Sequence, residues 1–196
     1  MKKLIVAAAA VSALFAGAAQ AADGSLGNTS SGTFDVTATV APMVQVTGLS
    51  DITLSIDPAS LRSNWGTTNG RTTFCVFSNV TAAGSYNVQV LGETGDGRAN
   101  PYGLIGQTTN TKLLHTVGYW DNAAYNSIDA LFMRQSIVRS SVNTRNGQQR
   151  ATTTNCSENG LGGKNASINV GIRNPIALAA LADTYKGTLT VVVSVP

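Results

Sequence analysis

The sequence has few of the residues on which catalysis and metal binding depend. It contains one histidine, His115, and two cysteines among 196 residues. A Ser-His-Asp set would need that histidine, which lies in a strand-like run, and no G-x-S-x-G motif is present. The separation of Cys75 and Cys156 excludes a C-x-x-C redox motif, and the lack of nearby histidine makes them poor metal ligands. We therefore expect no catalytic residue, no metal site and no cofactor.

Charged residues are also scarce, at 12% of the chain. The formal net charge is +3, and Lys2 and Lys3 supply two of these three charges. No basic stripe with interleaved aromatic residues is present, which argues against nucleic acid as a partner. A surface with little charge suits a protein that packs against copies of itself.

Long apolar runs are missing except at the beginning of the chain. Lys2 and Lys3 precede the apolar run 4–19, and Ala19-Gln20-Ala21 then supplies small residues for cleavage. This pattern predicts a secretory signal peptide at residues 1–21. The remaining 196 − 21 = 175 residues are enough for one domain with a real core. In an exported protein, the pair Cys75 and Cys156 is expected to form a disulfide.

The stretch "GTFDVTATVAP" (32–42) has the alternation of a half-buried strand. Its apolar positions share one face: Phe34, Val36, Ala38 and Val40. Two interpretations remain open from the pattern alone. The stretch is either the first strand of a self-contained sandwich or a strand that completes the sheet of another molecule.

Strand patterns dominate the rest of the chain and predict an all-β sandwich. They cover residues 43–49, 51–56, 72–79, 85–93, 112–120, 135–141, 166–173 and 187–195. A turn at Gly84 suggests a hairpin between 72–79 and 85–93. Short helices are expected at 174–183, with Asn174 as the cap, and at 127–135.

The last strand pattern has features of its own. Its apolar residues Leu189, Val191, Val193 and Val195 share one face, and Val192 on the other face suggests burial on both sides. A strand buried in this way needs a neighbour at each edge, and we expect one neighbour to be missing. Tyr185 precedes this strand, in the position of the tyrosine corner of immunoglobulin-like sandwiches.

Four segments together resemble the pilins of the bacterial chaperone–usher class, in the archaic branch grouped with the spore coat protein U family. They are "GSLGNTSSGTFDVTATV", "TTFCVFSNVTAAGSYNVQVLG", "HTVGYWDNA" and "NASINVGIRNPIALAALADTYKGTLTVVVSV". They extend over nearly all of the mature chain in the order of the family. The long loop 141–165, which contains Cys156, and the helix-like 127–135 depart from the family pattern.

This resemblance implies an incomplete immunoglobulin-like sandwich at residues 43–196 that lacks one strand. Residues 22–42 would be a donor-strand extension that fills the gap of a neighbouring copy through Phe34, Val36, Ala38 and Val40. The acceptor groove would lie between 51–56 and the last strand, lined by Leu189, Val191, Val193 and Val195. The implied partners are copies of the chain, a periplasmic chaperone and an outer-membrane usher, and the implied product is a surface pilus that serves adhesion or biofilm formation. The alternative is a secreted carbohydrate-binding module or tip adhesin, with Trp65 or Trp120 against a sugar.

Overall fold

The computed structural model describes residues 23–62, 66–96, 101–124, 131–135, 137–139, 151–158 and 162–196. The predicted signal peptide, 1–21, lies outside this part of the chain. The residues from Pro42 to Pro196 form one compact unit, the body, which is separate from the residues up to Ala41. Within the described residues, no helix has the length and apolar character needed to cross a membrane.

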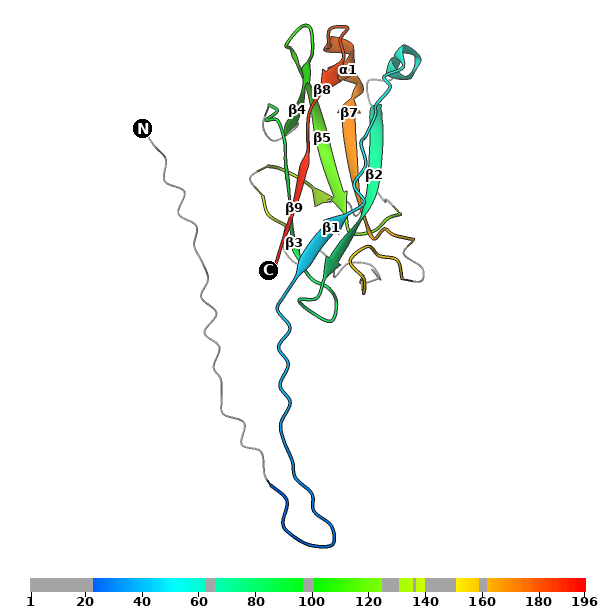
Figure 1. Cartoon of the computed structure of the whole chain (residues 1–196). Helices are drawn as coiled ribbons and strands as arrows, with labels where there is room; N and C mark the ends of the chain where they lie inside the picture. The colour runs from blue at the N-terminus through cyan, green and yellow to red at the C-terminus, as the bar shows by residue number, and fades with distance from the viewer. Residues whose placement is uncertain are drawn as a thin grey trace, which may run out of the picture. The chain divides into compact units, whose positions relative to one another are not determined.

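The body is an antiparallel all-β fold with two sheets, which confirms the predicted fold class (Figure 1). The larger sheet has the order β1 (Val44–Thr47), β2 (Thr67–Ser78), β7 (Ala166–Arg173), β5 (Lys112–Trp120), β4 (Tyr102–Gly106) and β8 (Tyr185–Lys186), with β6 (Leu131–Phe132) also beside β5. The smaller sheet pairs β3 (Asn87–Leu91) with β9 (Thr190–Ser194). A 3-10 helix, η1 (Pro58–Arg62), and a short helix, α1 (Asn174–Ala179), complete the elements.

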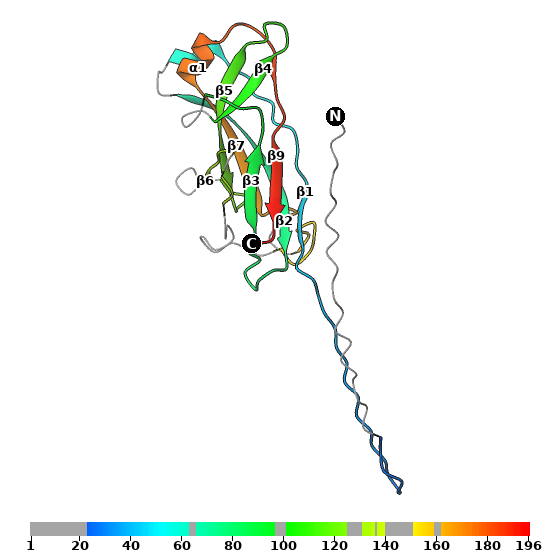
Figure 2. The same cartoon turned by 90° about the vertical axis from the view of Figure 1, so that its left-hand side faces the viewer.

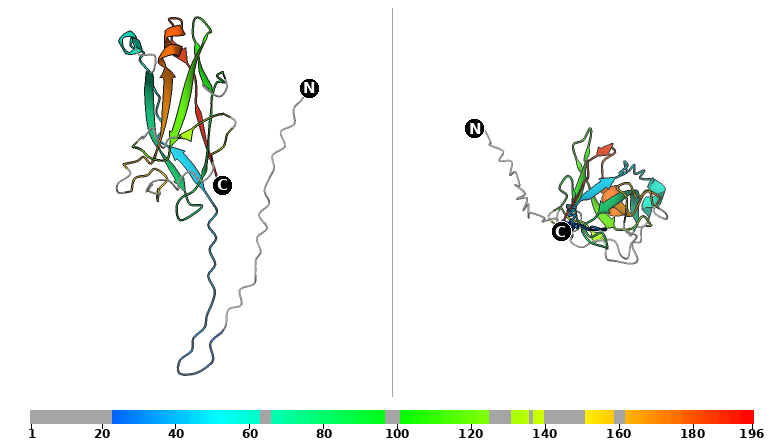
Figure 3. Two further views of the ribbon diagram at one scale, coloured as in Figure 1. Left: turned by 180° about the vertical axis from the view of Figure 1, so that it is seen from behind. Right: turned by 60° about the horizontal axis from the view of Figure 1, so that its bottom comes forward.

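Alternate residues of these strands form one hydrophobic core between the sheets. Because successive side chains of a strand point to opposite faces, each strand contributes every second residue to the interior. Phe74 of β2 and Tyr119 of β5 pack with ring centroids 6.2 Å apart, and the hydroxyls of Tyr119 and Tyr86 lie 2.6 Å apart. Figure 2 shows β3 and β9 side by side, and the right-hand view of Figure 3 shows the strands curling around a common interior.

The two sheets are joined along one side by residues 131–135 and 137–139. At one end of this segment, β6 pairs with Gly118 and Tyr119 of β5, and the Met133 amide donates to Val117 O at 2.9 Å. At the other end, Arg139 and Val88 of β3 exchange backbone hydrogen bonds of 2.8 and 2.9 Å. We call this connection the closed side of the body.

The predicted disulfide is present, between Cys75 of β2 and Cys156. Both cysteines are buried together with Ala151 in a small cluster that also contacts Phe77 and is distinct from the main core. A parallel bridge between Phe77 and Ala151 holds the same loop against β2. The disulfide therefore fixes the described part of the 141–165 loop to the face of β2 that carries Cys75 and Phe77.

Three local predictions are wrong. Residues 72–79 and 85–93 form no hairpin, because β2 and β3 belong to different sheets and Gly84, with φ of 72°, turns the chain from one sheet to the other. The described part of 127–135 contains strand β6 in place of a helix, because backbone pairing with β5 outweighs the local helical spacing. Val192 is 38% exposed, so β9 is buried on one face only.

The short helix predicted within 174–183 is present as α1, and it begins at Asn174, one residue earlier than a cap at Asn174 would place it. Arg173 is the N-cap residue, and Asn174 is the first helical residue and is buried. The Asn174 amide donates to Gly66 O at 2.9 Å, which ties α1 to the start of β2. The side chain of Asn174 is therefore buried in the body, and Asn174 is not the N-cap residue that was predicted.

Candidate functional site: an open groove

A groove opens in the body between residues 49–56 and residues 183–191. Its lower part has a volume of about 270 Å³ and lies between Ile52 and Leu54 on one wall and Leu189 and Val191 on the other. Its upper part, about 950 Å³, continues between Ser55 and Tyr185. The groove therefore follows the length of one wall of the body.

One wall forms because the chain leaves the sheet after β1. The β1–β2 ladder ends at Thr47, and Gly48, with φ of 77°, adopts the left-handed conformation that glycine tolerates best. Residues 51–56, predicted as a strand, take part in no ladder within the described part of the chain. Ile52 and Leu54 instead rest on Gly70 of β2, where an added Cβ would lie 2.4 Å from Ile52 Cγ2.

The other wall is the free edge of β9. This strand pairs with β3 along one edge, from Thr190 with Leu91 to Ser194 with Asn87, and has no second strand neighbour among the described residues. A row of backbone amides and carbonyls is therefore available at that edge. Unpaired edges of this kind are templates for the addition of another strand.

The floor of the groove comes from the opposite sheet. Ile168 and Val170 of β7 and Leu104 of β4 supply apolar surface, and Thr72 of β2 and His115 of β5 supply polar groups. The Thr72 hydroxyl lies 2.8 Å from the Ser50 hydroxyl and accepts a hydrogen bond of 3.3 Å from the Ser50 amide. Most of the surface that an occupant would contact is therefore apolar, with a polar region at the level of Thr72 and His115.

Asp183 fixes the upper end of the groove. Its carboxylate accepts hydrogen bonds from the Thr109 hydroxyl and amide, both at 2.7 Å, and from the Thr108 amide at 3.0 Å. These bonds, with that of the Thr109 hydroxyl foremost, hold the pKa of Asp183 below its usual value. The carboxylate ties the turn between β4 and β5 to the segment that enters β8.

Tyr185 lies beside Asp183 and also ties its segment to the sheet. Its hydroxyl donates to Leu181 O at 2.9 Å and lies 3.1 Å from the Thr111 hydroxyl. A hydrogen bond from this hydroxyl to the backbone a few residues upstream is the bond that a tyrosine corner makes. The chain therefore enters β9 from a segment held at both Asp183 and Tyr185.

The four residues predicted to line the groove occupy different positions along it. Leu189 and Val191 line its lower part. Val193 is half-buried against the core, and Val195 is 39% exposed at the end of the chain. The apolar face of the last strand is thus deepest where it borders the groove and becomes exposed toward residue 195.

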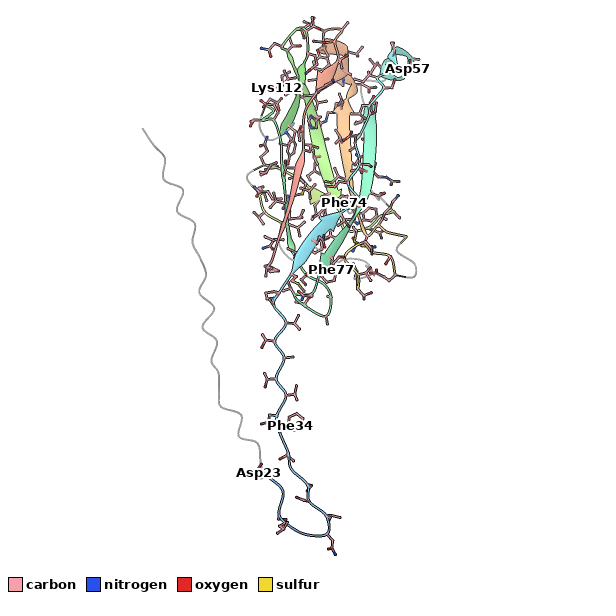
Figure 4. All side chains as sticks on the ribbon, in the orientation of Figure 1. Asp23, Phe34, Asp57, Phe74, Phe77 and Lys112 are labelled. Carbon is pink, nitrogen blue, oxygen red and sulfur yellow. A yellow bond between two sulfur atoms is a disulfide. The ribbon has the colours of Figure 1, made fainter. Side chains whose placement is uncertain are left out.

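The leading segment, residues 23–41, precedes the first strand of the body. Phe34, Val36 and Val40 are 76%, 83% and 75% exposed, and Ala38 is exposed as well. Figure 4 shows the Phe34 side chain standing away from an extended backbone. An alternating apolar face of this kind is unusual on a folded protein unless something covers it.

His115 has an unusual environment for the only histidine of the chain. It is 1% exposed and stacks on Tyr102, with ring centroids 5.7 Å apart. Burial lowers the pKa of His115 to about 4. The backbone of Leu113 comes near the ring without meeting the geometry of a hydrogen bond and acts in the opposite direction. The imidazole is therefore neutral at physiological pH.

We expect this histidine to make the body less stable in mild acid. Its pKa is about 4 in the folded state and about 6.5 in the unfolded state, so the unfolded state binds more protons between these values. Stability contributed by neutral His115 is complete above pH 6.5, and about 2.5 kcal/mol is lost between pH 7.5 and 4.5. Denaturant unfolding of the mature chain against its His115→Gln variant measures this, because the variant should lack that part of the slope. Equal pH slopes would contradict the expectation.

The aromatic residues considered for a sugar site are in part unsuited to it. Trp120 is only 6% exposed, so it presents no open face to a ligand. Trp65 lies outside the described residues. Among the described residues, no three His, Cys, Asp or Glu side chains gather as metal ligands would.

Sequence patterns did not identify the floor of the groove. Leu104, Thr72 and His115 come from three strands whose order in the sheet is not readable from the sequence. The alternation along β5 could have indicated the position of the histidine. His115 lies two residues from both Leu113 and Val117, so all three side chains point to the inward face of the strand. The walls were easier to predict, since each is a continuous segment.

Comparisons with known proteins give limited information. No protein-family model matches the chain, and no curated protein matches its sequence. A distant structural match is a chain in "Chaperone-tip adhesin complex is vital for synergistic activation of CFA/I fimbriae biogenesis", with 12% sequence identity and a TM-score of 0.46. The match covers 79% of the present chain and 41% of that chain, so the present chain spans less than half of its length.

Proposed function

We propose that this chain is a structural subunit, and the main shaft subunit, of a surface pilus built by donor-strand exchange. In this proposal residues 33–40 of one copy enter the groove of the next copy. The observation that carries it is the combination of a groove with free backbone edges and an exposed apolar strand-length segment in one chain. The sequence resemblance to chaperone–usher pilins supports the same function.

The groove is long enough for the segment. The wall from Asp183 to Val191 contains nine residues, and the segment from Phe34 to Val40 contains seven. At about 3.3 Å per residue, the extended segment is roughly 20 Å long and would lie within the length of the wall. Both also alternate, so side chains from the segment would enter the core between those of Leu189, Val191 and Val193.

The expected stabilisation is large. Burial of Phe34, Val36 and Val40 contributes about 1.5–3 kcal/mol each, or roughly 5–9 kcal/mol together, as an upper range. Each new backbone hydrogen bond along the edges of the groove adds about 0.5–1.5 kcal/mol. The sum is comparable to the stability of a whole domain. A link of this strength between subunits suits a fibre that must resist mechanical force.

The partners follow from the state of the free subunit. Before assembly, an open groove and an exposed apolar segment would both promote aggregation. A periplasmic chaperone would cover the groove, and an outer-membrane usher would exchange it for the next subunit. The chain would therefore pass through the periplasm, where the Cys75–Cys156 disulfide would form, and then reach the cell surface.

Deletion of residues 22–42 tests the proposal. The truncated subunit should still bind the chaperone, because its groove is intact, and should be absent from fibres, because it cannot fill the groove of a neighbour. Chaperone co-purification and electron microscopy of the cell surface measure the two properties. A matched control lacks only residues 23–32 and should still be incorporated. Fibres that contain the 22–42 deletion at normal levels would disprove the donor assignment.

A further inference from the structure

An uncharged apolar surface lies at the end of the body that carries α1. Residues 176–182 read IALAALA and contain no charged or polar side chain. Leu178, near the end of α1, and Leu181, shortly after it, are each 57% exposed. We call residues 176–182 the leucine patch. Exposed apolar groups gathered in this way mark sites of protein interaction, so we expect the patch to be covered by a partner.

The leucine patch is continuous with the groove. Residues 183–188 line the upper part of the groove, and only one residue separates Leu181 from Asp183. The Tyr185 hydroxyl donates to Leu181 O at 2.9 Å, which holds the patch beside the groove. A protein that inserts a strand into the groove therefore meets the leucine patch if its own body lies at the upper end.

The direction of the inserted segment decides at which end of the groove its body lies. Every ladder of the two sheets is antiparallel within the described residues, and antiparallel pairing is the more stable kind. A segment that adds to the free edge of β9 in the same way runs against β9. Phe34 then lies toward Val191, and Val40 lies at the upper end, toward Asp183.

The connection from the segment to its own body is short. Met43 is fixed in the body, because its amide donates to Asn79 Oδ1 at 2.6 Å and its carbonyl accepts from the Asn79 amide at 3.2 Å. Two residues separate Met43 from Val40, so the Cα atoms of Met43 and Val40 are at most about 11 Å apart. The body of the donor copy must therefore lie against the upper end of the body that it fills.

The end of the body that carries Met43 matches the leucine patch in character. Met43 is 49% exposed, and the turn beside it, residues 79–84, reads NVTAAG and has no charge. Val80 is half-buried in this turn, and Ala82 and Ala83 are exposed. Figure 1 shows the turn, between β2 and β3, at the opposite end of the body from α1. Contact between the two ends would bury apolar surface without the cost of burying a charge.

We propose that the leucine patch binds the Met43 end of the next copy of this chain, whose leading segment fills the adjacent groove. The contact is a second interface between consecutive subunits, in addition to the inserted strand. It limits the rotation of one body against the next, which the short connection alone would permit. This proposal rests on the proposed function and adds the surface that orients consecutive subunits.

Cross-linking in fibres of the full mature chain tests the contact. Met43→Cys is combined with Leu178→Cys in one variant and with Leu181→Cys in another, while the native cysteines stay in their disulfide. A short bismaleimide should join consecutive subunits and give a ladder of oligomers on heated, reducing denaturing gels. Met43→Cys with Val138→Cys is the matched control and should give no ladder, since Val138 is 50% exposed on the closed side. Fibres with no ladder from either test pair, or with an equal ladder from the control, would overturn the proposal.

A second measurement does not depend on new cysteines. Leu178→Ser with Leu181→Ser removes the apolar contact at exposed positions, so the body should still fold. Fibres of this variant should dissociate in guanidinium about tenfold faster than wild-type fibres, because two leucine side chains lose their burial at the contact. Val138→Ser is the control and should dissociate at the wild-type rate. An unchanged rate for the double variant would contradict the proposed contact.

A peptide separates this interface from the inserted strand. A synthetic peptide of residues 23–41 carries the segment without a body. It should therefore displace the chaperone from the full-length Leu178→Ser, Leu181→Ser subunit as fast as from the wild-type subunit. Slower displacement would assign the two leucines to the groove and overturn the interface. If wild-type subunits accept no peptide and form no fibres, the proposed function fails, and that result is distinct from loss of the contact between bodies.

Discussion

Mature chains that carry Val36→Asp are expected to form no fibres. The substitution removes the burial of one valine, about 1.5–3 kcal/mol, and places a carboxylate in an apolar groove at a further cost of several kcal/mol. Together these effects weaken each link between subunits by roughly a thousandfold or more. Electron microscopy and size-exclusion chromatography measure the outcome, which should be soluble monomer or chaperone-bound subunit.

Thr37→Asp is the control for this experiment. It adds the same charge one residue further along, on the opposite face of the extended segment, which lies outside the groove when Val36 lies inside. Fibres of this variant should therefore form. If Val36→Asp and Thr37→Asp assembled equally well, the alternating face of the segment would have no part in assembly.

Removal of the disulfide is expected to have the second-largest effect. The bond between Cys75 and Cys156 closes a loop with a sequence separation of 81. In the chain-entropy model, such a link stabilises the folded state by about 4.5 kcal/mol. The double variant Cys75→Ala with Cys156→Ala should lose stability of this order in guanidinium unfolding of the mature chain at neutral pH.

The reduced wild-type protein is the natural comparison for that variant. Because the cysteine cluster is separate from the main core, reduction should lower stability while the apolar groove walls remain in place. A loss below about 1 kcal/mol in both the reduced protein and the double variant would show that the cross-link contributes little. Retention of donor-segment binding after reduction would agree with the separation of the two clusters.

The parts of the fold that sequence patterns predict are those set by local alternation. The strands over 112–120 and 166–173 match β5 and β7, because inward and outward residues alternate along each and neighbouring strands bury the inward face. The pairing of Cys75 with Cys156 was also predictable, since no other cysteine was available. Residues 51–56 and 187–195 were predicted as strands from the same alternation, and their role as groove walls came from the resemblance to chaperone–usher pilins.

The parts that could not be predicted depend on contacts between distant segments. Gly84 indicates a turn, yet the pattern does not say whether the chain returns to the same sheet or crosses to the other. Leu131 and Phe132 have helical spacing and are held as β6 by backbone bonds to β5. The environment of His115 required knowledge that β2, β4, β5 and β7 meet beneath the groove, which no single segment specifies.

The connection of the two sheets along one side has a mechanical consequence. Residues 131–132 pair with β5 and Arg139 pairs with β3, whereas the opposite margin, between β9 and residues 49–56, has no ladder across it in the described part of the chain. An incoming strand therefore has to displace solvent and align its backbone, but it does not have to break the pairing that holds the host subunit together.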